Sequence, residues 1–589
     1  MARNPKRFPL DMIRHSTAHV MAAAVKELYP ATVFGIGPSI DDGFYYDLQL
    51  PDGKTLGPDD LVLIDEKMRE IVAADIPFLE EELSKEEARA RFADQPFKLE
   101  LIDELPDDEA LTVYTISGEA CDFSDLCRGP HLGSTGYIKY FQLMKLAGAY
   151  WRGDSERPML QRIYGTSWQK AGQLTQYLEM LEEAERRDHR RLGKELDLFS
   201  FSELGGAGFP LYHPKGARVL QLLGDWLRDE LYKRGYVEVR TPHVYRVEMW
   251  KMSGHFDNYK DDMYFFDVPE GKDKDGKDKF NEFAIKPMNC PGHMMIYGAN
   301  LHSYRDLPVR MFEFGTVYRN ELSGVAHGLM RARGFTQDDA HIFCRPDQVN
   351  DEVLKMLDLV DYVMSTFGFE YTAELSTRPE KSMGSDETWE LTTNALRSAL
   401  DEYGTDYTVN EGDGAFYGPK IDIHLKDAIG RTWQCSTIQF DALLPERFNL
   451  EYRTAENNAE RPLMLHRAIL GSMERFFGIL LEHYGGGLPS WLAPVQVALI
   501  PINDDMISYA EEVADKLVAA GVRCEIDGAS APMKAKIAKA QQQKIPYMLI
   551  LGKREAEEGK VGLRHRTEGD LGAVTLDDFL SRLESEKPK

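Results

Sequence analysis

Residues 319–341 read RNELSGVAHGLMRARGFTQDDAH, an arginine and a polar loop followed by a segment that closes on His341. Apolar alternation over residues 311–318 predicts a strand directly before Arg319, which would hold that side chain rigidly. A guanidinium group bonds phosphate oxygens at two points at once. The arrangement therefore favours a phosphate-binding site at the end of this strand.

Three zinc-type ligands, one of them His341, are spread across the middle of the chain. Cys290 lies in the stretch KPMNCPGH at residues 286–293, and His466 comes nine residues before Arg475. If the three converge, they leave one coordination position open, because catalytic zinc takes three protein ligands and structural zinc usually takes four. The plainer interpretation is a buried thiol and two core histidines. We expect one recognition Zn²⁺ per subunit beside the phosphate site.

Three segments resemble the class-defining motifs of class II aminoacyl-tRNA synthetases. Residues 319–321 with 333–341 are similar to the second motif, and LGSMERFF at residues 470–477 is similar to the third. A predicted helix, strand and closing proline over residues 216–242 resembles the first motif, which builds the dimer interface in that family. With the three zinc-type ligands in place, nearly the whole chain resembles the bacterial threonyl-tRNA synthetase family.

The resemblance and the changes of pattern along the chain predict a multidomain α+β protein. We expect an amino-terminal α+β editing domain at residues 1–166, a linker helix at 167–192, a class II catalytic domain with an antiparallel sheet at 193–490, and a carboxy-terminal α/β anticodon-binding domain at 491–589. A lysine-rich insert at residues 270–282 is expected to be a solvated hairpin tip. The family's amino-terminal ubiquitin-like domain is missing, either by nature or by truncation.

Composition sets weaker limits on function. The 589 residues carry a formal net charge of −27, so any contact with tRNA needs local basic patches against an unfavourable overall field. Six cysteines without regular spacing fit a reduced cytoplasmic enzyme, and Cys121, Cys344, Cys435 and Cys524 are expected to be structural thiols. No apolar stretch approaches the roughly 18 residues that cross a bilayer. We therefore expect a cytoplasmic protein without a membrane partner.

The resemblance implies an ATP site around Arg319, with Mg²⁺ on the phosphates. Arg319 would contact the α-phosphate and Phe335 would stack on adenine. The other implied nucleotide contacts are Glu321, Arg331, Gln434 and Arg475. Ser472 is a predicted helix N-cap, which places Arg475 in the first turn, where a cation is unfavourable unless an anion lies nearby. The plainer partner for Arg475 is Glu474 or Glu482.

The same resemblance implies how L-threonine would be bound. An apolar pocket separates threonine from isosteric valine by only about 100-fold, whereas an open zinc position would take the amino group and the hydroxyl together. The implied threonine contacts are Gln337, Asp339, Tyr417 and Gln439. The implied catalytic residues are Arg319, Lys420 and His255, of which His255 would relay a proton during transfer to the tRNA or would be only a structural histidine.

Zinc would not reject serine, which also has a hydroxyl, so such an enzyme needs a second, hydrolytic site. His15 and His19 lie four residues apart in a predicted helix and face the same way, and Cys127 and His131 form a second pair. Four such ligands suit zinc, as in alanyl-type editing proteins, but this pocket works without metal in the threonyl family, and we favour that interpretation. Further family positions expected to orient the misacylated ribose and a water are Tyr46, Lys98 and Asp125.

The implied activity is that of a homodimeric threonine--tRNA ligase, which charges tRNA(Thr) and hydrolyses mischarged seryl-tRNA. A basic helix near the carboxy terminus would contact an anticodon loop, and it carries Lys534, Lys536, Lys539 and Lys544 with three glutamines at 541–543. Two other classes stay open, a deacylase acting only on mischarged tRNA and a noncatalytic RNA-binding paralogue. Intact Arg319, Phe335 and Arg475 argue against both.

Overall fold

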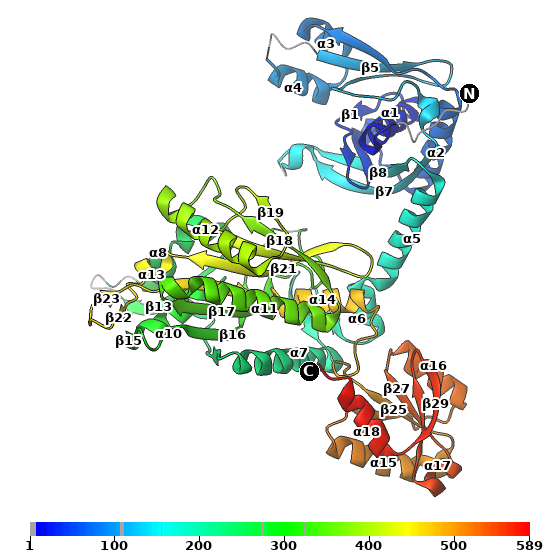
Figure 1. The fold of residues 1–589 in the computed structure, drawn as a ribbon. Helices are drawn as coiled ribbons and strands as arrows, with labels where there is room; N and C mark the ends of the chain where they lie inside the picture. The colour runs from blue at the N-terminus through cyan, green and yellow to red at the C-terminus, as the bar shows by residue number, and fades with distance from the viewer. Residues whose placement is uncertain are drawn as a thin grey trace. The chain divides into compact units, whose positions relative to one another are not determined.

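The computed structural model describes residues 8–106, 111–154, 156–272, 276, 278–322 and 324–588. The chain divides into two compact units, Met1–Glu182 and Glu183–Lys589 (Figure 1). The predicted linker covers helix α5 (Ala171–Arg187) and the first part of α6 (His189–Glu195), and the domain boundaries given above stay predictions. Every described helix is too short or too polar to cross a bilayer.

The first unit contains two antiparallel sheets and helix α1 (Leu10–Leu28). Helix α1 is buried along most of its length, because small and apolar residues lie between its histidines. One sheet has the order β1-β3-β8-β7 with β2 beside β3, and the other the order β4-β5-β6. The strands are β1 (Val33–Phe34), β2 (Ser39–Ile40), β3 (Gly43–Gln49), β4 (Leu79–Leu83), β5 (Leu111–Ser117), β6 (Asp122–Leu126), β7 (Tyr140–Tyr150) and β8 (Met159–Trp168). The other helices are α2 (Pro58–Ala73), α3 (Lys85–Arg91) and α4 (Pro96–Glu104).

The second unit is built on an eight-stranded sheet. Its strand order is β11 (Val237–Glu238), β16 (Val309–Tyr318), β17 (Gly334–Cys344), β24 (Leu463–Ala468), β21 (Thr432–Asp441), β20 (Lys420–Lys426), β18 (Glu370–Ser376) and β19 (Tyr407–Asn410). The inner six strands pair antiparallel, and only the outermost pairs β11–β16 and β18–β19 are parallel. The predicted antiparallel catalytic sheet is confirmed, as is the strand before Arg319.

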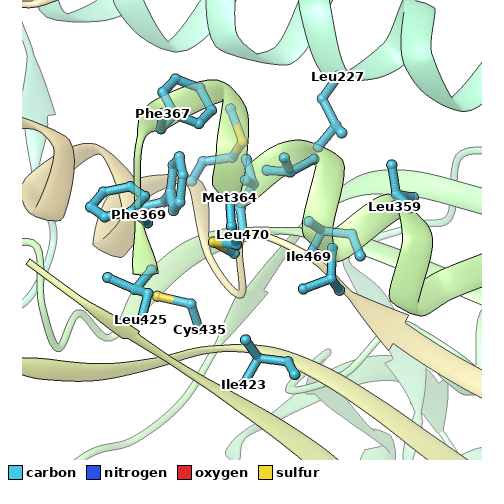
Figure 2. Close-up of a cluster of buried hydrophobic side chains, with 14 of the residues drawn as sticks. Leu227, Leu359, Met364, Phe367, Phe369, Ile423, Leu425, Cys435, Ile469 and Leu470 are labelled. Carbon is cyan, nitrogen blue, oxygen red and sulfur yellow. The ribbon is translucent and has the colours of Figure 1, made fainter. Parts of the chain in front are cut away.

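One face of this sheet is closed by helices α7 (Pro214–Lys233), α11 (Val349–Phe367), α12 (Asp386–Tyr403) and α14 (Met473–His483). Figure 2 shows Leu227, Met364 and Phe367 from the helices in one buried cluster with Ile423 and Leu425 from β20. Because successive strand residues point to opposite faces, the residues on the other side of each strand are left to build a site.

Shorter elements complete this part of the unit. The helices are α8 (Val247–Ser253), α9 (His255–Tyr259), α10 (Cys290–Gly298) and α13 (Leu444–Arg447). Three small sheets pair β10 (Leu211–Tyr212) with β9 (Phe199–Ser200), β12 (Val244–Arg246) with β14 (Asp278–Ile285) and β13 (Tyr264–Lys272), and β15 (His302–Ser303) with β22 (Tyr452–Arg453) and β23 (Ala459–Glu460). Residues 273–275 and 277 of the expected hairpin tip lie outside the described residues.

The carboxy-terminal segment forms a five-stranded sheet of order β26-β25-β27-β28-β29, in which β25 pairs parallel with both neighbours. The strands are β25 (Val497–Pro501), β26 (Cys524–Ile526), β27 (Tyr547–Leu551), β28 (Val561–His565) and β29 (Gly569–Val574). The helices are α15 (Ile507–Ala519), α16 (Met533–Gln542), α17 (Lys553–Glu558) and α18 (Leu576–Ser585). The predicted α/β module with parallel strands is confirmed.

The predicted basic helix in this segment needs a correction. Lys536, in α16, is buried, and its ammonium donates to the carbonyls of Pro501 at 3.1 Å and Asp527 at 3.0 Å. Lys539 pairs with the Asp527 carboxylate at 3.2 Å. The amphipathic pattern did not predict the burial of Lys536, because the sequence does not distinguish an exposed lysine from a buried one whose ammonium group binds backbone carbonyls. Lys536 therefore stabilises the fold and is not placed to contact RNA.

Candidate active site

A cavity of about 910 Å³ lies on the open face of the eight-stranded sheet. Its wall includes fourteen of the fifteen residues predicted for the catalytic domain. These are Cys290, Arg319, Glu321, Arg331, Phe335, Gln337, Asp339, His341, Tyr417, Lys420, Gln434, Gln439, His466 and Arg475. Residues separated by up to 185 positions in sequence thus share one site, since 475 − 290 = 185.

Strand alternation explains most of this convergence. On β17 the odd-numbered residues from Phe335 to His341 line the cavity, whereas Ala340 and Ile342 enter the core behind the sheet. On β21 alternation alone would separate Gln434 from Gln439. A bulge at Cys435 shifts the register, because Gln434 pairs with His424 while Ser436 already pairs with Ile423. The extra residue re-aims the strand, so both glutamines line the same cavity.

Two arginines face the cavity without an acidic partner. Arg319 donates from Nε to the carbonyl of Pro287 at 3.3 Å, and its guanidinium lies 5.1 Å from the Phe335 ring centre and 5.7 Å from that of Tyr259. Neither Arg319 nor Arg475 forms an ion pair with any residue that the structure describes. Because an unpaired cation in a partly enclosed site is costly, the pair favours an anionic ligand, and the neighbouring rings favour a flat one.

The helix geometry around Arg475 is as predicted, and the two glutamates named as its plainer partners bind other residues. Ser472 is the N-cap of α14, and its Oγ accepts from the Arg475 backbone N–H at 3.0 Å. Glu474 instead accepts from the Thr336 N–H at 2.8 Å, and burial raises the pKa of Glu474 to about 7. Glu482 pairs with other residues at the far end of the helix. The alternative of a salt bridge from Arg475 to either glutamate is therefore excluded, which leaves its guanidinium group available for an anion.

Hydrogen-bond partners connect the two candidate metal histidines to the side chains around them. His466 Nε2 lies 3.0 Å from Asp441 Oδ2, so it carries the proton and donates, which leaves the lone pair on Nδ1. His341 Nδ1 lies 2.9 Å from His293 Nδ1, and His293 Nε2 lies 3.4 Å from Glu313 Oε1 without a hydrogen-bond partner among the described residues.

The two imidazoles also face each other. His341 Nε2 and His466 Nδ1 are 3.0 Å apart, and His466 Nδ1 carries the lone pair. Burial lowers the pKa of His341 well below its usual range, so its imidazole stays neutral. Two neutral imidazoles at this separation, one of them with a carboxylate behind it, suit a zinc ion.

Cys290 completes this candidate metal centre. Its Sγ lies within 4.8 Å of both ligand nitrogens, and all three side chains are buried. Burial raises the pKa of the Cys290 thiol well above its usual range, which a bound cation would reverse by stabilising the thiolate. One sulfur and two nitrogens form a Zn²⁺ donor set with a coordination position to spare. The residues present fit the predicted metal.

Other residues hold the polar wall beside this centre. Asn289, which sequence reasoning missed, donates from Nδ2 to Asp339 Oδ2 at 2.9 Å, and Tyr417 donates from its hydroxyl to Gln439 Oε1 at 3.2 Å. Lys420 pairs with Asp422 at 2.7 Å. Asn289 immediately precedes Cys290, so proximity in sequence to a metal ligand was the signal that would have found it.

His255 is the predicted catalytic residue that the cavity wall does not include. It is fully buried behind Cys290, with Nε2 3.8 Å from Cys290 Sγ and Nδ1 2.8 Å from Ser253 Oγ. Burial lowers the pKa of His255 to about 3. An enclosed imidazole that stays neutral and does not reach the cavity supports the structural role, and the geometry gives the proton relay no support.

The seven residues predicted for editing form one cluster in the first unit. Lys98 forms an ion pair with Asp125, and Tyr46 donates to the same carboxylate. Cys127 Sγ lies 3.1 Å from His15 Nε2 and 3.3 Å from His131 Nε2, and His19 Nε2 lies 3.7 Å from Asp125 Oδ2. Elements α1, β3, α4, β6 and the loop after β6 thus contribute to a single polar pocket.

The donor atoms of His15, His19, Cys127 and His131 lie within 4.8 Å of one another, so distance alone permits a metal. Ser16 Oγ accepts from the Leu132 N–H and lies 3.0 Å from His131 Nδ1. A hydroxyl group can either donate to that nitrogen or accept from it, so the contact fits both interpretations, and the metal-free pocket stays a prediction.

We expect acid to destabilise this pocket. Burial lowers the pKa values of His15, His19 and His131 in the folded unit, and repulsion by neighbouring histidines lowers those of His19 and His131 further. Unfolded histidine has a pKa near 6.5, so below that pH the unfolded chain binds more protons and stability falls, by up to about 1.4 kcal/mol per pH unit and histidine. Hydrogen-exchange protection of α1 in the full chain should drop between pH 7 and 5. His131→Gln should reduce this pH dependence. An unchanged dependence of the protection on pH would contradict its attribution to the buried histidines.

Three family models match the chain. Residues 111–164 match "Threonyl and Alanyl tRNA synthetase second additional domain", residues 270–484 match "tRNA synthetase class II core domain (G, H, P, S and T)", and residues 496–586 match "Anticodon binding domain". The first lies in the unit with the histidine pocket, and the second includes most of the cavity wall.

Individual relatives match over most of their length. A threonine--tRNA ligase of Syntrophomonas wolfei is 53% identical over 97% of this chain and 87% of its own length. A threonine--tRNA ligase of Desulforamulus reducens is 52% identical over 97% of this chain and 88% of its own length. Among solved structures, the RNA binding domain of threonyl-tRNA synthetase from Cryptosporidium parvum superposes with a TM-score of 0.65 at 43% identity, over 68% of this chain and 99% of its own. A putative threonyl-tRNA synthetase of Aeropyrum pernix superposes with a TM-score of 0.58 at 31% identity, over 68% of this chain and 96% of its own.

Proposed function

Because the chain belongs to the threonine--tRNA ligase family, we propose that it activates L-threonine with ATP, transfers it to tRNA(Thr) and hydrolyses mischarged seryl-tRNA(Thr). One observation carries the synthetic part of this proposal. The unpaired Arg319 and Arg475 and the ring of Phe335 face the same cavity as Cys290 and its two histidines. A triphosphate with a flat base and a small amino acid fit such a wall.

In the first step, a threonine carboxylate oxygen attacks the α-phosphorus of ATP, and pyrophosphate leaves with its electron pair. Arg319 stabilises the charge on the α-phosphate, and Arg475 with Arg331 holds the outer phosphates, accompanied by Mg²⁺. Phe335 and Gln434 hold the adenine side. These are positioning and electrostatic roles, which suit side chains fixed on strands of one sheet. In the second step, a terminal ribose hydroxyl attacks the aminoacyl carbonyl and AMP leaves.

Selection of threonine rests on the candidate metal centre. Cys290, His341 and His466 would hold one Zn²⁺, which would supply a Lewis-acid position for the amino group and hydroxyl of threonine but not for valine. Asp339, oriented by Asn289, would accept from the ammonium group, and Tyr417 and Gln439 would close the side-chain pocket. Family membership further supports a homodimer, with the predicted first-motif segment at residues 216–242 as its interface.

Hydrolysis of seryl-tRNA(Thr) would take place in the histidine pocket of the first unit. Water attacks the ester carbonyl, and the ribose oxygen leaves with a proton. Lys98 and Asp125 are fully enclosed beside Tyr46, so they would orient the ribose and the water in a site of low dielectric. His15 and His19 stay neutral there and are available to accept a proton from that water.

We expect Lys98→Met to lower the rate of seryl-tRNA(Thr) deacylation about 100-fold, because the buried Asp125 loses its counter-ion and the pocket a donor. Deacylation of purified seryl-tRNA by the full chain measures this, and accumulation of seryl-tRNA in charging assays should rise in parallel. Threonine activation should not change. Lys67→Met, at a surface ion pair with Glu70 in the same unit, is the matched control. Equal rates in both variants would exclude Lys98 from editing.

Exchange of labelled pyrophosphate into ATP tests the whole proposal, with each of the twenty amino acids and metal-replete protein. We expect exchange with threonine, weaker exchange with serine and almost none with valine. Exchange with no amino acid would overturn the ligase proposal and favour a deacylase or an RNA-binding paralogue. Deacylation of seryl-tRNA in the same preparation separates these two.

A further inference from the structure

A buried histidine outside the cavity contacts the loop that forms part of its wall. His189 is the first residue of α6 and is fully buried. Its Nε2 lies 3.0 Å from the backbone N–H of Leu329, which donates to it. Leu329, Met330, Arg331 and Ala332 all belong to the cavity wall. One imidazole outside the site thus holds the backbone of a segment that faces the ligand.

The contact defines the protonation state of His189. An N–H can only donate, so Nε2 must be without a proton, and the imidazole proton is on Nδ1. Nδ1 lies 2.6 Å from Glu482 Oε1, the acceptor that this tautomer requires, and the same oxygen accepts from the His189 backbone N–H at 3.1 Å. Glu482 therefore orients the ring and selects the tautomer that accepts from Leu329.

Close packing restricts the loop at the same point. Gly328 has a φ of +54°, and a Cβ at that position would lie 2.1 Å from His189 Nε2. The backbone is thus pressed against the ring, where only glycine fits. On its other side, Leu329 is buried against α14, since a Cβ at Gly478 would meet its Cβ at 3.4 Å. The loop is clamped between α6 and α14.

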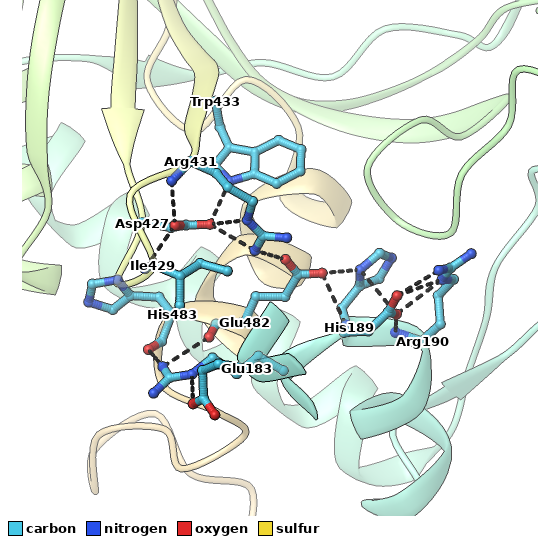
Figure 3. Close-up of polar contacts among 11 residues, drawn as sticks. Glu183, His189, Arg190, Asp427, Ile429, Arg431, Trp433, Glu482 and His483 are labelled. Atoms are coloured by element: carbon cyan, nitrogen blue, oxygen red, sulfur yellow. Dashed lines mark hydrogen bonds and ion pairs between the residues drawn. The ribbon is translucent and has the colours of Figure 1, made fainter. Parts of the chain in front are cut away.

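Glu482 contacts Arg431 as well as His189, and Arg431 and Trp433 both bind Asp427 (Figure 3). The second oxygen of Glu482 pairs with Arg431, which donates to Asp427 Oδ2 at 2.8 Å, and the Trp433 indole donates to the same Asp427 oxygen at 3.0 Å. Trp433 lines the cavity. Glu482 itself lies two turns after Arg475 on α14. A single carboxylate thus joins the loop, the arginine helix and strand β21.

We propose that His189, oriented by Glu482, is a positioning residue for ATP binding, which holds the loop at Gly328–Leu329 in the conformation that places Arg331 on the nucleotide side of the cavity. His189 contacts no substrate in this role. The proposal rests on the proposed ATP-dependent activation and adds to it a residue that lies outside both the cavity wall and the three motifs quoted above. Threonine binding, which is proposed for cavity residues outside this loop, should be insensitive to it.

Two isosteric variants separate the two hydrogen bonds. In His189→Asn, the amide nitrogen takes the place of Nδ1 and keeps the bond to Glu482, but the acceptor for Leu329 is lost. In His189→Gln, the amide oxygen takes the place of Nε2 and keeps that acceptor. In pyrophosphate exchange we expect the KM for ATP to rise about tenfold in the Asn variant, the ratio for one lost hydrogen bond, with little change in the KM for threonine. The Gln variant should stay within about twofold of wild type.

Hydrogen–deuterium exchange of peptides covering residues 324–333 gives a second readout that needs no activity. We expect the Leu329 region to exchange faster in the Asn variant and at the wild-type rate in the Gln variant. If wild-type protein shows no pyrophosphate exchange, the proposed function fails, whereas this measurement still tests the clamp. Equal KM values for ATP in both variants and wild type would overturn the positioning role.

Both variants could instead lose kcat or thermal stability to the same extent, with no specific rise in the KM for ATP. That result would also overturn the positioning role of His189, because it is the result expected of a purely structural histidine. Should the Asn variant not fold, Glu482→Gln tests the same clamp. That change removes the anionic acceptor from Nδ1, and the KM for ATP should rise while the KM for threonine does not. An unchanged ratio of the two constants would again contradict the proposal.

Discussion

Cys290→Ala is expected to yield protein with well under one zinc per chain and threonine activation reduced about 1000-fold. The two remaining imidazoles would still face each other at 3.0 Å, but two nitrogens without the thiolate bind zinc far more weakly. Loss of the cation also removes the electrostatic contact that threonine makes and valine does not, so the residual exchange should no longer distinguish the two amino acids. Metal analysis of purified protein and pyrophosphate exchange with both amino acids measure these effects.

Cys344→Ala is the matched control for this experiment. Cys344 is also a fully buried thiol at the end of β17, but it packs in the core behind the sheet. Its variant should lose some stability to a small cavity and keep its zinc and its selectivity. Full zinc content and normal selectivity in the Cys290 variant would exclude the metal centre. Two zinc ions per wild-type chain would instead place a second metal in the histidine pocket of the first unit.

Arg319→Gln is expected to reduce pyrophosphate exchange about 1000-fold, mainly through kcat. Arg319 has no acidic partner among the described residues, so its charge is available to the α-phosphate, where charge develops in the transition state. Removal of one such contact usually costs about 100- to 1000-fold. Steady-state exchange at varied ATP separates an effect on kcat from one on KM.

Arg554→Gln controls for loss of a positive charge. Its side chain is 83% exposed in an ion pair with Glu558 on α17, a contact worth little in water. That variant should exchange pyrophosphate at the wild-type rate. If Arg319→Gln raised only the KM for ATP, Arg319 would bind the ground state and not stabilise the transition state, and the role proposed for it would be wrong.

Local patterns predicted much of the fold and the membership of the cavity wall. Alternation before Arg319, the N-cap at Ser472 and the strands near residues 497 and 547 are properties of short segments, and each is confirmed. Fourteen residues implied by the family resemblance line one cavity, and the roles given to them stay predictions. The surroundings of some buried side chains were predicted poorly, because Lys536 is buried and His255 lies behind the cavity.

The sequence by itself determined which side chains are present and in what local order, and therefore the family, the strands and the candidate ligands. Tertiary structure alone decided which atoms meet. The bulge at Cys435 brings Gln434 to the cavity, Asp441 sets the tautomer of His466, and Glu482 turns His189 toward Leu329. Each depends on hydrogen bonds between residues far apart in sequence, and such bonds arise from packing of distant elements, about which local periodicity carries no information.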